Sequence, residues 1–254
     1  MLLVFDIGNT QTVVGVFFEE QLVASWKLAT DRQRTVDEYG VLLKNLFRDS
    51  GLETTQINAV VLSSVVPPVT GVFERMVIKY FSTHPLVVGP GVKTGLAFKY
   101  ENPREIGADR VVNAVAAIKL YGSPLIVVDF GTATTFCAIA PNREYQGGAV
   151  APGLGISSEA LFQRTAKLPR IEIEKPKTII GKNTTNAMQA GIFYGYLGLV
   201  EGIITRMQAE MNCDPLIIAT GDFASLISDN TKMINRVEPN LTLQGLRYIY
   251  ELNK

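Results

Sequence analysis

The stretch Met1-Leu-Leu-Val-Phe-Asp6-Ile-Gly8-Asn-Thr10-Gln-Thr-Val-Val-Gly-Val-Phe17 has a close counterpart in Leu125-Ile-Val-Val-Asp129-Phe-Gly131-Thr132-Ala-Thr134-Thr-Phe-Cys-Ala-Ile139. In each stretch, an apolar run rich in β-branched residues reaches an aspartate, turns at a glycine and resumes as a second apolar run, which is typical of a β-hairpin. The second stretch begins about half-way along the 254-residue chain. Such a repeat predicts two related halves that present matching loops to one shared cleft.

The composition of the chain restricts its class. Hydrophobic side chains make up 47% of it, enough for a large core, and its length suits one or two domains. The 24 basic and 24 acidic side chains balance, so we expect no nucleic-acid partner and no attraction to an anionic membrane. We find no apolar run near the roughly 20 residues that a spanning helix needs and no signal peptide, and we expect a cytoplasmic protein.

The cysteines and the histidine carry no metal or redox signature. Cys137 and Cys213 have no CxxC spacing and no neighbouring histidine, which favours two reduced structural thiols. His84 is the only histidine and cannot form a zinc site alone.

The order of the expected elements is that of an α/β protein. In the first half we expect the hairpin, strands at 21–28, 59–65 and 86–88, and helices at 35–49, 67–81 and 111–120. In the second half we expect the hairpin, strands at 145–150 and 216–220, and helices at 155–163, 185–211, 223–228 and 241–252. This alternation predicts a mixed sheet covered by helices in each half. Because Gly122-Ser-Pro124 precedes the second hairpin, we divide the chain into an N-terminal domain, 1–119, and a C-terminal domain, 120–254.

The two hairpin loops have the chemistry of a phosphate site. Their glycines allow backbone N–H groups to approach a ligand, and short side chains near them donate hydrogen bonds to phosphate oxygens. These donors are Asn9, Thr10, Thr12, Thr132 and Thr134.

The loops are nevertheless acidic. Asp6 and Asp129 are anions, and no Lys or Arg occurs at 1–26 or 121–142. Two like unit charges at 4 Å repel by about 1 kcal/mol in water and by several times more in a cleft, so Mg²⁺, with or without a second ion, must accompany a polyphosphate. The alternative interpretation is that each Asp-Gly element only makes a hairpin turn.

The segment Gly107-Ala-Asp109-Arg110 precedes an expected helix with a regular apolar face. Asp109 therefore either caps that helix or accepts the proton of an attacking hydroxyl. Arg110 either forms a surface ion pair with Glu105 or holds a substrate carboxylate or a phosphoryl group. Tyr100 suits strand packing, and Thr184 suits the cap of a long helix.

Together these motifs resemble those of the type III pantothenate kinases, which belong to the superfamily of acetate and sugar kinases, actin and heat-shock chaperones. The resemblance covers essentially the whole chain. Besides the two acidic loops and Gly107-Ala-Asp109-Arg110, it rests on Gly147-Gly-Ala-Val-Ala-Pro-Gly153, Gly181-Lys-Asn-Thr184-Thr-Asn-Ala-Met188-Gln-Ala-Gly191 and Thr242-Leu-Gln-Gly-Leu-Arg-Tyr248. It implies two ribonuclease-H-like, actin-like ATPase lobes, each a mixed sheet flanked by helices, with a cleft between them for ATP.

The resemblance also implies a role for particular residues. Asp109 is the implied catalytic base. Asp6 is the implied ligand of magnesium, directly or through water, and Asp129 that of a monovalent cation, K⁺ or NH₄⁺. The implied ATP-binding residues are Asp6, Ile7, Gly8, Asn9, Thr10, Gln11, Thr12, Val13, Gly131 and Thr132. The implied pantothenate-binding residues are Tyr100, Gly107, Ala108, Asp109, Arg110 and Thr184.

The activity that the resemblance implies is ATP-dependent phosphorylation of the primary hydroxyl of pantothenate, the first step of coenzyme A biosynthesis, by a homodimer. Glycines recur along one helix at positions 191, 195, 198 and 202, which suits a packed core or a dimer face, because Glu201 and Arg206 interrupt the apolar pattern of a membrane span. Two alternatives stay open: a kinase of a sugar or carboxylate acceptor, and a non-catalytic, actin-like nucleotide switch.

One motif departs from the family pattern. Where the family usually has Thr-Gly-Gly after a late strand, this chain has Thr220-Gly221-Asp222. The carboxylate either changes the adenine contact and the nucleotide preference or caps the helix that follows.

Overall fold

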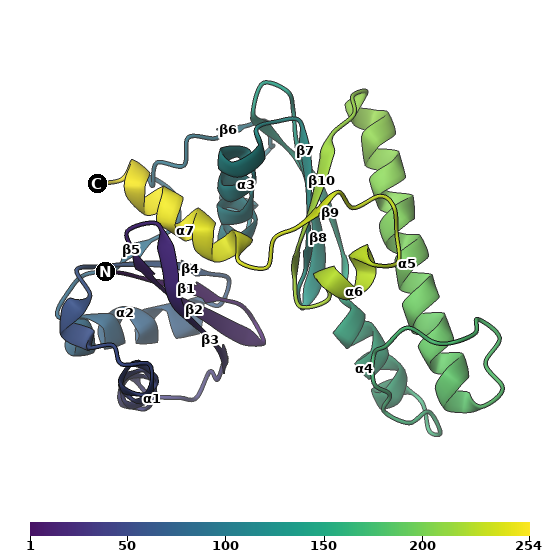
Figure 1. The fold of residues 1–254 in the computed structure, drawn as a ribbon, viewed down its shortest axis with the longest axis horizontal. Coiled ribbons are helices and arrows are strands. Elements are labelled where there is room, and N and C mark those ends of the chain that lie inside the picture. The colour runs from purple at the N-terminus through teal and green to yellow at the C-terminus, as the bar shows by residue number, and fades with distance from the viewer. The chain divides into compact units, whose positions relative to one another are not determined.

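The computed structural model describes residues 1–254, which form two compact units (Figure 1). The first unit consists of Met1–Gly95, Asn102–Ala116 and Leu241–Lys254, and the second of Leu96–Glu101 and Ala117–Asn240. Each unit is a mixed sheet flanked by helices, as the α/β fold class predicts. These units differ from a single division after residue 119, because the C-terminal segment packs on the first sheet.

The first sheet has the strand order β3-β2-β1-β4-β5. Its strands are β1 (Leu2–Ile7), β2 (Gln11–Phe18), β3 (Gln21–Ala29), β4 (Ala59–Ser64) and β5 (Leu86–Val87). The hairpin pairs β1 with β2 antiparallel, whereas β4 lies parallel to β1 on its other side. β1 is almost wholly buried, because elements pack on both faces of the sheet, which explains its unbroken apolar run.

Helices cover both faces of the first sheet. The helices of this unit are α1 (Val36–Asp49), α2 (Pro67–Phe81), the Ala108–Ala116 part of α3 (Ala108–Tyr121) and α7 (Leu241–Leu252), with single 3₁₀ turns at Thr54–Gln56 and Pro103–Glu105. α1 begins with the predicted capping box of Thr35 and Glu38, and α2 begins at Pro67. On one face, the side chains of Tyr39 and Phe73 join the core.

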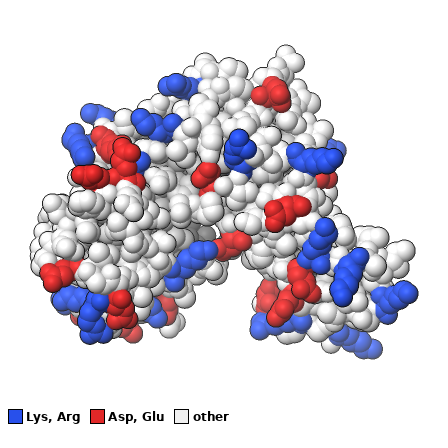
Figure 2. All heavy atoms as spheres, in the orientation of Figure 1, with Lys and Arg blue, Asp and Glu red and all other residues white.

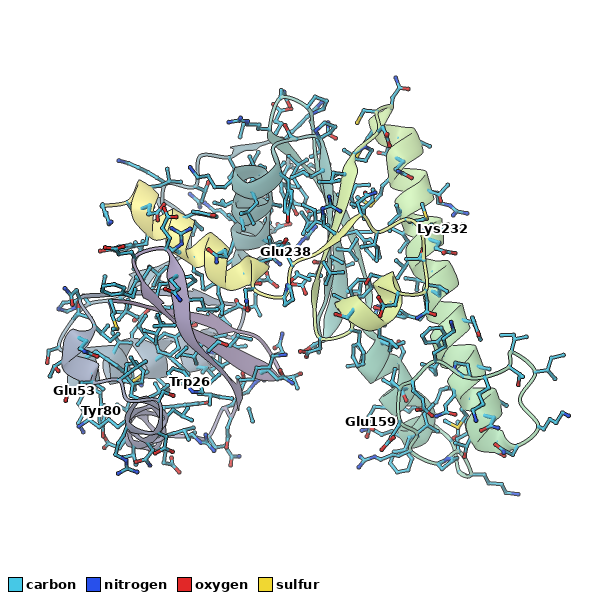
Figure 3. All side chains as sticks on the ribbon, viewed as in Figure 1. Trp26, Glu53, Tyr80, Glu159, Lys232 and Glu238 are labelled. Atoms are coloured by element: carbon cyan, nitrogen blue, oxygen red, sulfur yellow. The ribbon has the colours of Figure 1, made fainter.

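Aromatic rings fill the core between this sheet and its helices. The Phe73 ring lies 4.6 Å from that of Tyr39 and 5.2 Å from that of Phe5. Trp26, labelled in Figure 3, lies 5.5 Å from Phe47. Such pairs contribute roughly 0.5–1.5 kcal/mol each beyond the area that they bury.

The opposite face of the first sheet is covered by α7, which contacts β1, β2 and β4. A Cβ on Gly15 would lie 3.0 Å from the Leu243 side chain and 3.1 Å from that of Val4, so α7 lies close over this part of the sheet. The segment from residue 241 onward therefore completes the unit that the chain begins.

The second sheet has the strand order β11-β10-β7-β8-β9-β6. Its strands are β6 (Ala97–Phe98), β7 (Leu125–Phe130), β8 (Ala133–Ile139), β9 (Glu144–Pro152), β10 (Leu216–Gly221) and β11 (Arg236–Val237). The hairpin β7–β8 occupies the place that β1–β2 has in the first sheet, because β7 also has an antiparallel partner on one side and a parallel partner, β10, on the other. The repeat seen in the sequence is therefore a repeat of topology.

The helices of the second unit, besides the end of α3, are α4 (Leu154–Arg164), α5 (Thr184–Met211) and α6 (Ala224–Ser228). α5 buries Tyr196, Val200 and Ile204 in the core of the second sheet. By length and composition alone this helix would be able to span a membrane, with a mean hydropathy of 1.2 over an 18-residue window, contrary to our expectation that no such run exists. One such helix is weak evidence, since a core helix of a soluble protein meets the same criterion.

The charged side chains are interspersed on the face shown in Figure 2, where Lys and Arg alternate with Asp and Glu. Cys137 is buried, Cys213 is partly exposed, and both are free thiols.

Candidate active site

The first acidic loop joins β1 to β2 and is held tightly. Asp6 and Ser63 are register partners on parallel strands, and the buried Ser63 hydroxyl donates a 3.0 Å hydrogen bond to Asp6 Oδ1. The Gly8 N–H donates to the Gln11 carbonyl at 3.0 Å, and a Cβ on Gly8 would lie 2.9 Å from that oxygen. Only glycine fits this turn without a shift, and the turn leaves Asn9 exposed at the tip of the loop.

The segment after β3 is tied to this loop. The Thr30 N–H donates to the Thr10 carbonyl at 3.0 Å, and the Thr12 and Thr30 hydroxyls are hydrogen-bonded at 2.9 Å. Arg32 Nη2 donates to Asn9 Oδ1 at 3.4 Å. Arg32 is not evident from the loop sequence, because only the pairing of β2 with β3 brings it to the loop.

Asp109 lies on α3 in the same unit. It is the second residue of the helix, and its carboxylate accepts a 2.8 Å hydrogen bond from the Arg110 N–H. A Cβ on Gly107 would lie 2.4 Å from Asp109 Oδ1 and 3.6 Å from Val65 Cγ1. Val65 follows β4 directly and donates its N–H to the Ile7 carbonyl, so the Asp109 segment reaches the edge of the sheet where β1 also ends.

The environment of Asp109 alters its acidity. Burial raises the pKa of the Asp109 carboxyl above its ordinary value, although the Arg110 N–H and the Arg110 charge lower it in part. A carboxylate with a raised pKa is a stronger base than a free one, which is the property that proton abstraction from a hydroxyl needs.

Arg110 is buried, with 9% of its surface exposed. Glu105, the partner considered for a surface ion pair, accepts a 2.8 Å hydrogen bond from Asn102 Nδ2. A guanidinium offers planar N–H donors that are able to bind a carboxylate or a phosphoryl group with two parallel hydrogen bonds.

The second acidic loop joins β7 to β8 in the second unit. Asp129 and Thr220 are register partners on parallel strands. A Cβ on Gly221, which has a φ of +93°, would lie 2.7 Å from Asp129 Oδ1. Gly153 donates its N–H to the Thr132 carbonyl at 3.1 Å, and a Cβ there would lie 2.2 Å from that oxygen. Two glycines therefore allow neighbouring strands to close tightly around this loop.

Two of the predicted hydroxyl donors are engaged inside the protein. Thr12 is fully buried and bonded to Thr30, and Thr134 is fully buried and hydrogen-bonded to the Tyr196 hydroxyl. The exposed hydroxyls of the two loops are those of Thr10 and Thr132.

Two further predicted site residues, Tyr100 and Thr184, belong to the second unit. Tyr100 packs its ring against Gly147, where a Cβ would lie 3.4 Å from it. Thr184 is the exposed first residue of α5, and Asn183 caps the helix by accepting a 2.8 Å hydrogen bond from the Asn186 N–H, so the alternative of Thr184 as the cap is wrong. Thr184 instead lines a pocket of about 660 Å³ within this unit, together with Leu161, Leu168, Gly181, Lys182, Asn183, Ala187, Met188, Gly191 and Ile192.

Asp222 follows β10 and is exposed. The N-cap residue of α6 is Phe223, so the interpretation of Asp222 as the cap of that helix is also wrong.

Two helix-flanked mixed sheets, each built on a hairpin that turns through Asp-x-Gly, define a protein of the sugar-kinase and actin-like ATPase fold. Solved structures share this fold. One described as a Baf family transcriptional activator from Campylobacter jejuni has a TM-score of 0.63 and 16% identity, and covers 99% of this chain and 98% of its own. One described as a 2-dehydro-3-deoxygalactonokinase from Sinorhizobium meliloti has a TM-score of 0.61 and 9% identity, with 99% and 96% covered.

Sequence comparison gives the particular family. The model of the type III pantothenate kinase family matches residues 2–206. A type III pantothenate kinase from Geobacter sulfurreducens is 58% identical over 254 residues, all of both chains, and one from Bacillus cytotoxicus is 58% identical over 253 residues, 100% of this chain and 97% of that one. The chain belongs to the type III pantothenate kinase family.

Proposed function

We propose that this protein transfers the γ-phosphoryl group of ATP to the primary hydroxyl of pantothenate, which forms 4′-phosphopantothenate, the first intermediate on the route to coenzyme A. Full-length relatives at 58% identity are described as type III pantothenate kinases, and their family implies an ATP-dependent kinase that works with a divalent metal. The observation that carries the proposal is the placement of Asp109, whose segment reaches the same sheet edge as the Asp6 loop.

The first loop holds the phosphates in this proposal. Its tight turn leaves Asn9 and Thr10 exposed at the tip, where they donate to phosphate oxygens. The Ser63 hydroxyl fixes Asp6, and a carboxylate oxygen is the ligand type that Mg²⁺ prefers, directly or through water. When bound, Mg²⁺ neutralises charge on the β- and γ-phosphates.

Asp109 accepts the proton of the pantothenate hydroxyl as that oxygen attacks phosphorus. Its burial supports the role, because a raised pKa increases the affinity of the carboxylate for a proton. The planar guanidinium of Arg110 binds the pantothenate carboxylate through two parallel hydrogen bonds. Tyr100 and Thr184 complete the acceptor site.

The second loop contributes Gly131 and Thr132 to the nucleotide and Asp129 to a monovalent cation, K⁺ or NH₄⁺. The absence of Lys and Arg from 121–142 favours a metal ion over a side chain as the counter-charge there. That both acidic loops serve one nucleotide stays a prediction.

A homodimer in the cytoplasm is the expected working form. The second unit exposes large apolar side chains, namely Val150, Ile156, Leu161, Ile179 and Ile180. These side chains are candidates for a subunit contact. Sedimentation that finds a stable and fully active monomer would remove the dimer from the proposal.

Product analysis tests the activity. The protein is incubated with ATP, Mg²⁺ and K⁺, and pantothenate or a set of sugars is offered separately. We expect phosphorylated pantothenate only, and less of it when Na⁺ replaces K⁺. Phosphorylation of a sugar alone would identify another kinase, and ATP turnover without any acceptor would identify a nucleotide switch.

A further inference from the structure

The β1–β2 loop has a neighbour in the chain that brings it a positive charge. Three contacts join residues 30–32 to this loop: Thr30 N–H to the Thr10 carbonyl at 3.0 Å, the Thr12 and Thr30 hydroxyls at 2.9 Å, and Arg32 Nη2 to Asn9 Oδ1 at 3.4 Å. All of these residues belong to the first unit. The Arg32 guanidinium therefore lies at the tip of the loop.

The backbone next to Arg32 is held by hydrogen bonds to the side chain of Tyr39. The hydroxyl of Tyr39, a fully buried residue, accepts a 2.9 Å hydrogen bond from the Asp31 N–H and donates one of 3.0 Å to the Asp31 carbonyl. The Asp31 carboxylate turns back to accept from the Gln33 N–H at 2.9 Å. The segment thus directs a cation to the loop and engages its own anion elsewhere.

A phosphate chain at this loop needs a positive charge beside it. Residues 1–26 contain no Lys or Arg, and Asp6 repels a phosphate chain. The contact of Arg32 with Asn9 is long, involves a neutral amide oxygen and uses one of five N–H donors, while the side chain stays exposed. The remaining donors match the geometry of a phosphate, which a guanidinium binds with two parallel hydrogen bonds.

We propose that Arg32 binds the phosphate chain of the nucleotide at the β1–β2 loop and supplements the charge of the metal. The inference rests on the proposed function only in taking a nucleoside polyphosphate as the ligand of this loop. A role of Arg32 in the stability of the fold alone predicts a different outcome of the same experiment, an equal loss of affinity for all three ligands.

Calorimetric titration of the full chain with Mg²⁺ and ATP, ADP or adenosine, without an acceptor, separates the two roles. For Arg32→Gln we expect affinity for ATP and ADP to fall about tenfold, the loss of one charged hydrogen-bonded contact, and affinity for adenosine to stay within about twofold. Arg32→Lys keeps the charge and recovers part of the loss. Arg48→Gln, the same change at an exposed position near the end of α1, leaves all three affinities unchanged.

Arg32→Gln that binds ATP as tightly as the unaltered chain, or that loses adenosine affinity to the same degree, would overturn the inference, as would an unaltered chain that binds no ATP. Thermal unfolding of each variant checks that it is folded. The proposed function is judged separately by product analysis. If the unaltered chain fails to phosphorylate pantothenate but Arg32→Gln still weakens ATP selectively, the proposed function alone is wrong.

Discussion

Gly245 holds α7 against the helix that carries Asp109, which makes Gly245→Ala a direct test of how that helix is positioned. A Cβ at this position would lie 2.2 Å from the Val112 carbonyl oxygen and 2.7 Å from Val112 Cγ1. The two helices are also joined by a 2.7 Å hydrogen bond from the Thr242 hydroxyl to Asn113 Oδ1. Because ordinary contact begins at 3.4 Å, one helix has to move by roughly 1 Å.

The displacement has two expected consequences. Overpacking a well-packed contact costs about 1–3 kcal/mol, and the higher helix propensity of alanine offsets about 1 kcal/mol of it, so the free energy of unfolding falls by at most about 2 kcal/mol. Val112 follows Asp109, the proposed base, by three residues on the same helix, and a shift of about 1 Å at such a group lowers turnover by about 10²-fold. We therefore expect a larger effect on kcat than the modest loss of stability alone would give.

The assay measures kcat, KM for pantothenate and urea-induced unfolding of Gly245→Ala. Gly71→Ala in α2 is the matched control, because its Cβ would meet nothing closer than the flexible end of Arg75 at 3.5 Å, so it should stabilise the protein by about 0.5–1 kcal/mol without loss of turnover. A Gly245→Ala protein with unaltered kcat and unfolding would refute the claim that this contact sets the position of α3.

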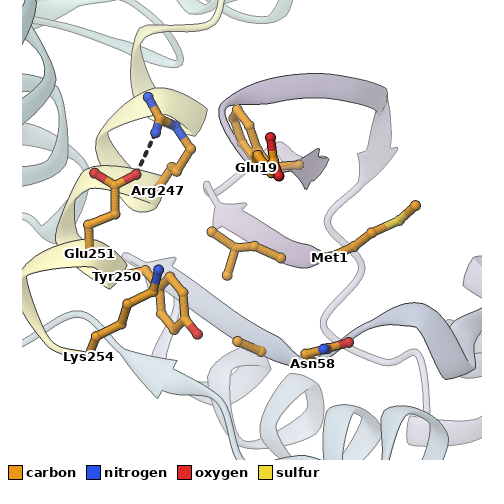
Figure 4. Close-up of a pocket in the computed structure, with 10 residues that line it drawn as sticks. Met1, Glu19, Asn58, Arg247, Tyr250, Glu251 and Lys254 are labelled. Atoms are coloured by element: carbon orange, nitrogen blue, oxygen red, sulfur yellow. Dashed lines mark hydrogen bonds and ion pairs between the residues drawn. The ribbon is translucent and has the colours of Figure 1, made fainter.

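Substitutions at three further positions test other parts of the structure. Asp109→Asn should lower turnover by about 10²- to 10⁴-fold and abolish the acidic limb of the pH–rate profile, which should lie above pH 3.8. A carboxyl group with a raised native pKa stabilises the protein below its unfolded-state pKa, and this contribution is lost as the pH rises through the native pKa. Asp109→Asn should therefore be at least as stable as the original chain at pH 7. Urea unfolding that shows a less stable variant would contradict the direction of the pKa shift. Arg247 is buried beside Phe17 and donates a hydrogen bond to Glu251 (Figure 4). Arg247→Ala should lower the free energy of unfolding by about 2 kcal/mol, and Arg247→Met, which keeps the packing, by about half of that. Equal losses of the two variants in chemical denaturation would assign the whole effect to charge. Gly221→Ala, with its Cβ 2.7 Å from the Asp129 carboxylate, should raise the K⁺ concentration for half-maximal activity several-fold, and an unchanged K⁺ response would separate Asp129 from the cation.

Elements with strong local signals could be predicted from the sequence. The capping box of Thr35 fixed the start of α1, Pro67 fixed that of α2, and the two Asp-x-Gly hairpins gave the centre of each sheet. The strands β6 and β11 were missed because each is two residues long and has no periodic pattern.

Features that depend on packing between distant segments left no local trace. Nothing in the residues around Leu243 indicates that they cover Gly15 in the first sheet. Arg32 reaches Asn9 only because β2 and β3 pair and bring Thr30 to Thr12. In the candidate site, the acidic loops and the Asp109 segment were found from their motifs, whereas the direction of the Asp109 pKa shift needed its burial to be known.

The return of α7 to the first sheet reverses the order in which the nascent protein can mature on the ribosome. Every residue of the second unit has been translated before Leu241 emerges, so that unit is able to finish folding first. Meanwhile, α7 does not yet cover the face of the first sheet to which Val4 belongs. The strand that leads into the Asp6 turn thus reaches its final environment only when translation has passed residue 252. A ribosome that stalls shortly before this point would release a chain with a mature later half and an open, aggregation-prone beginning.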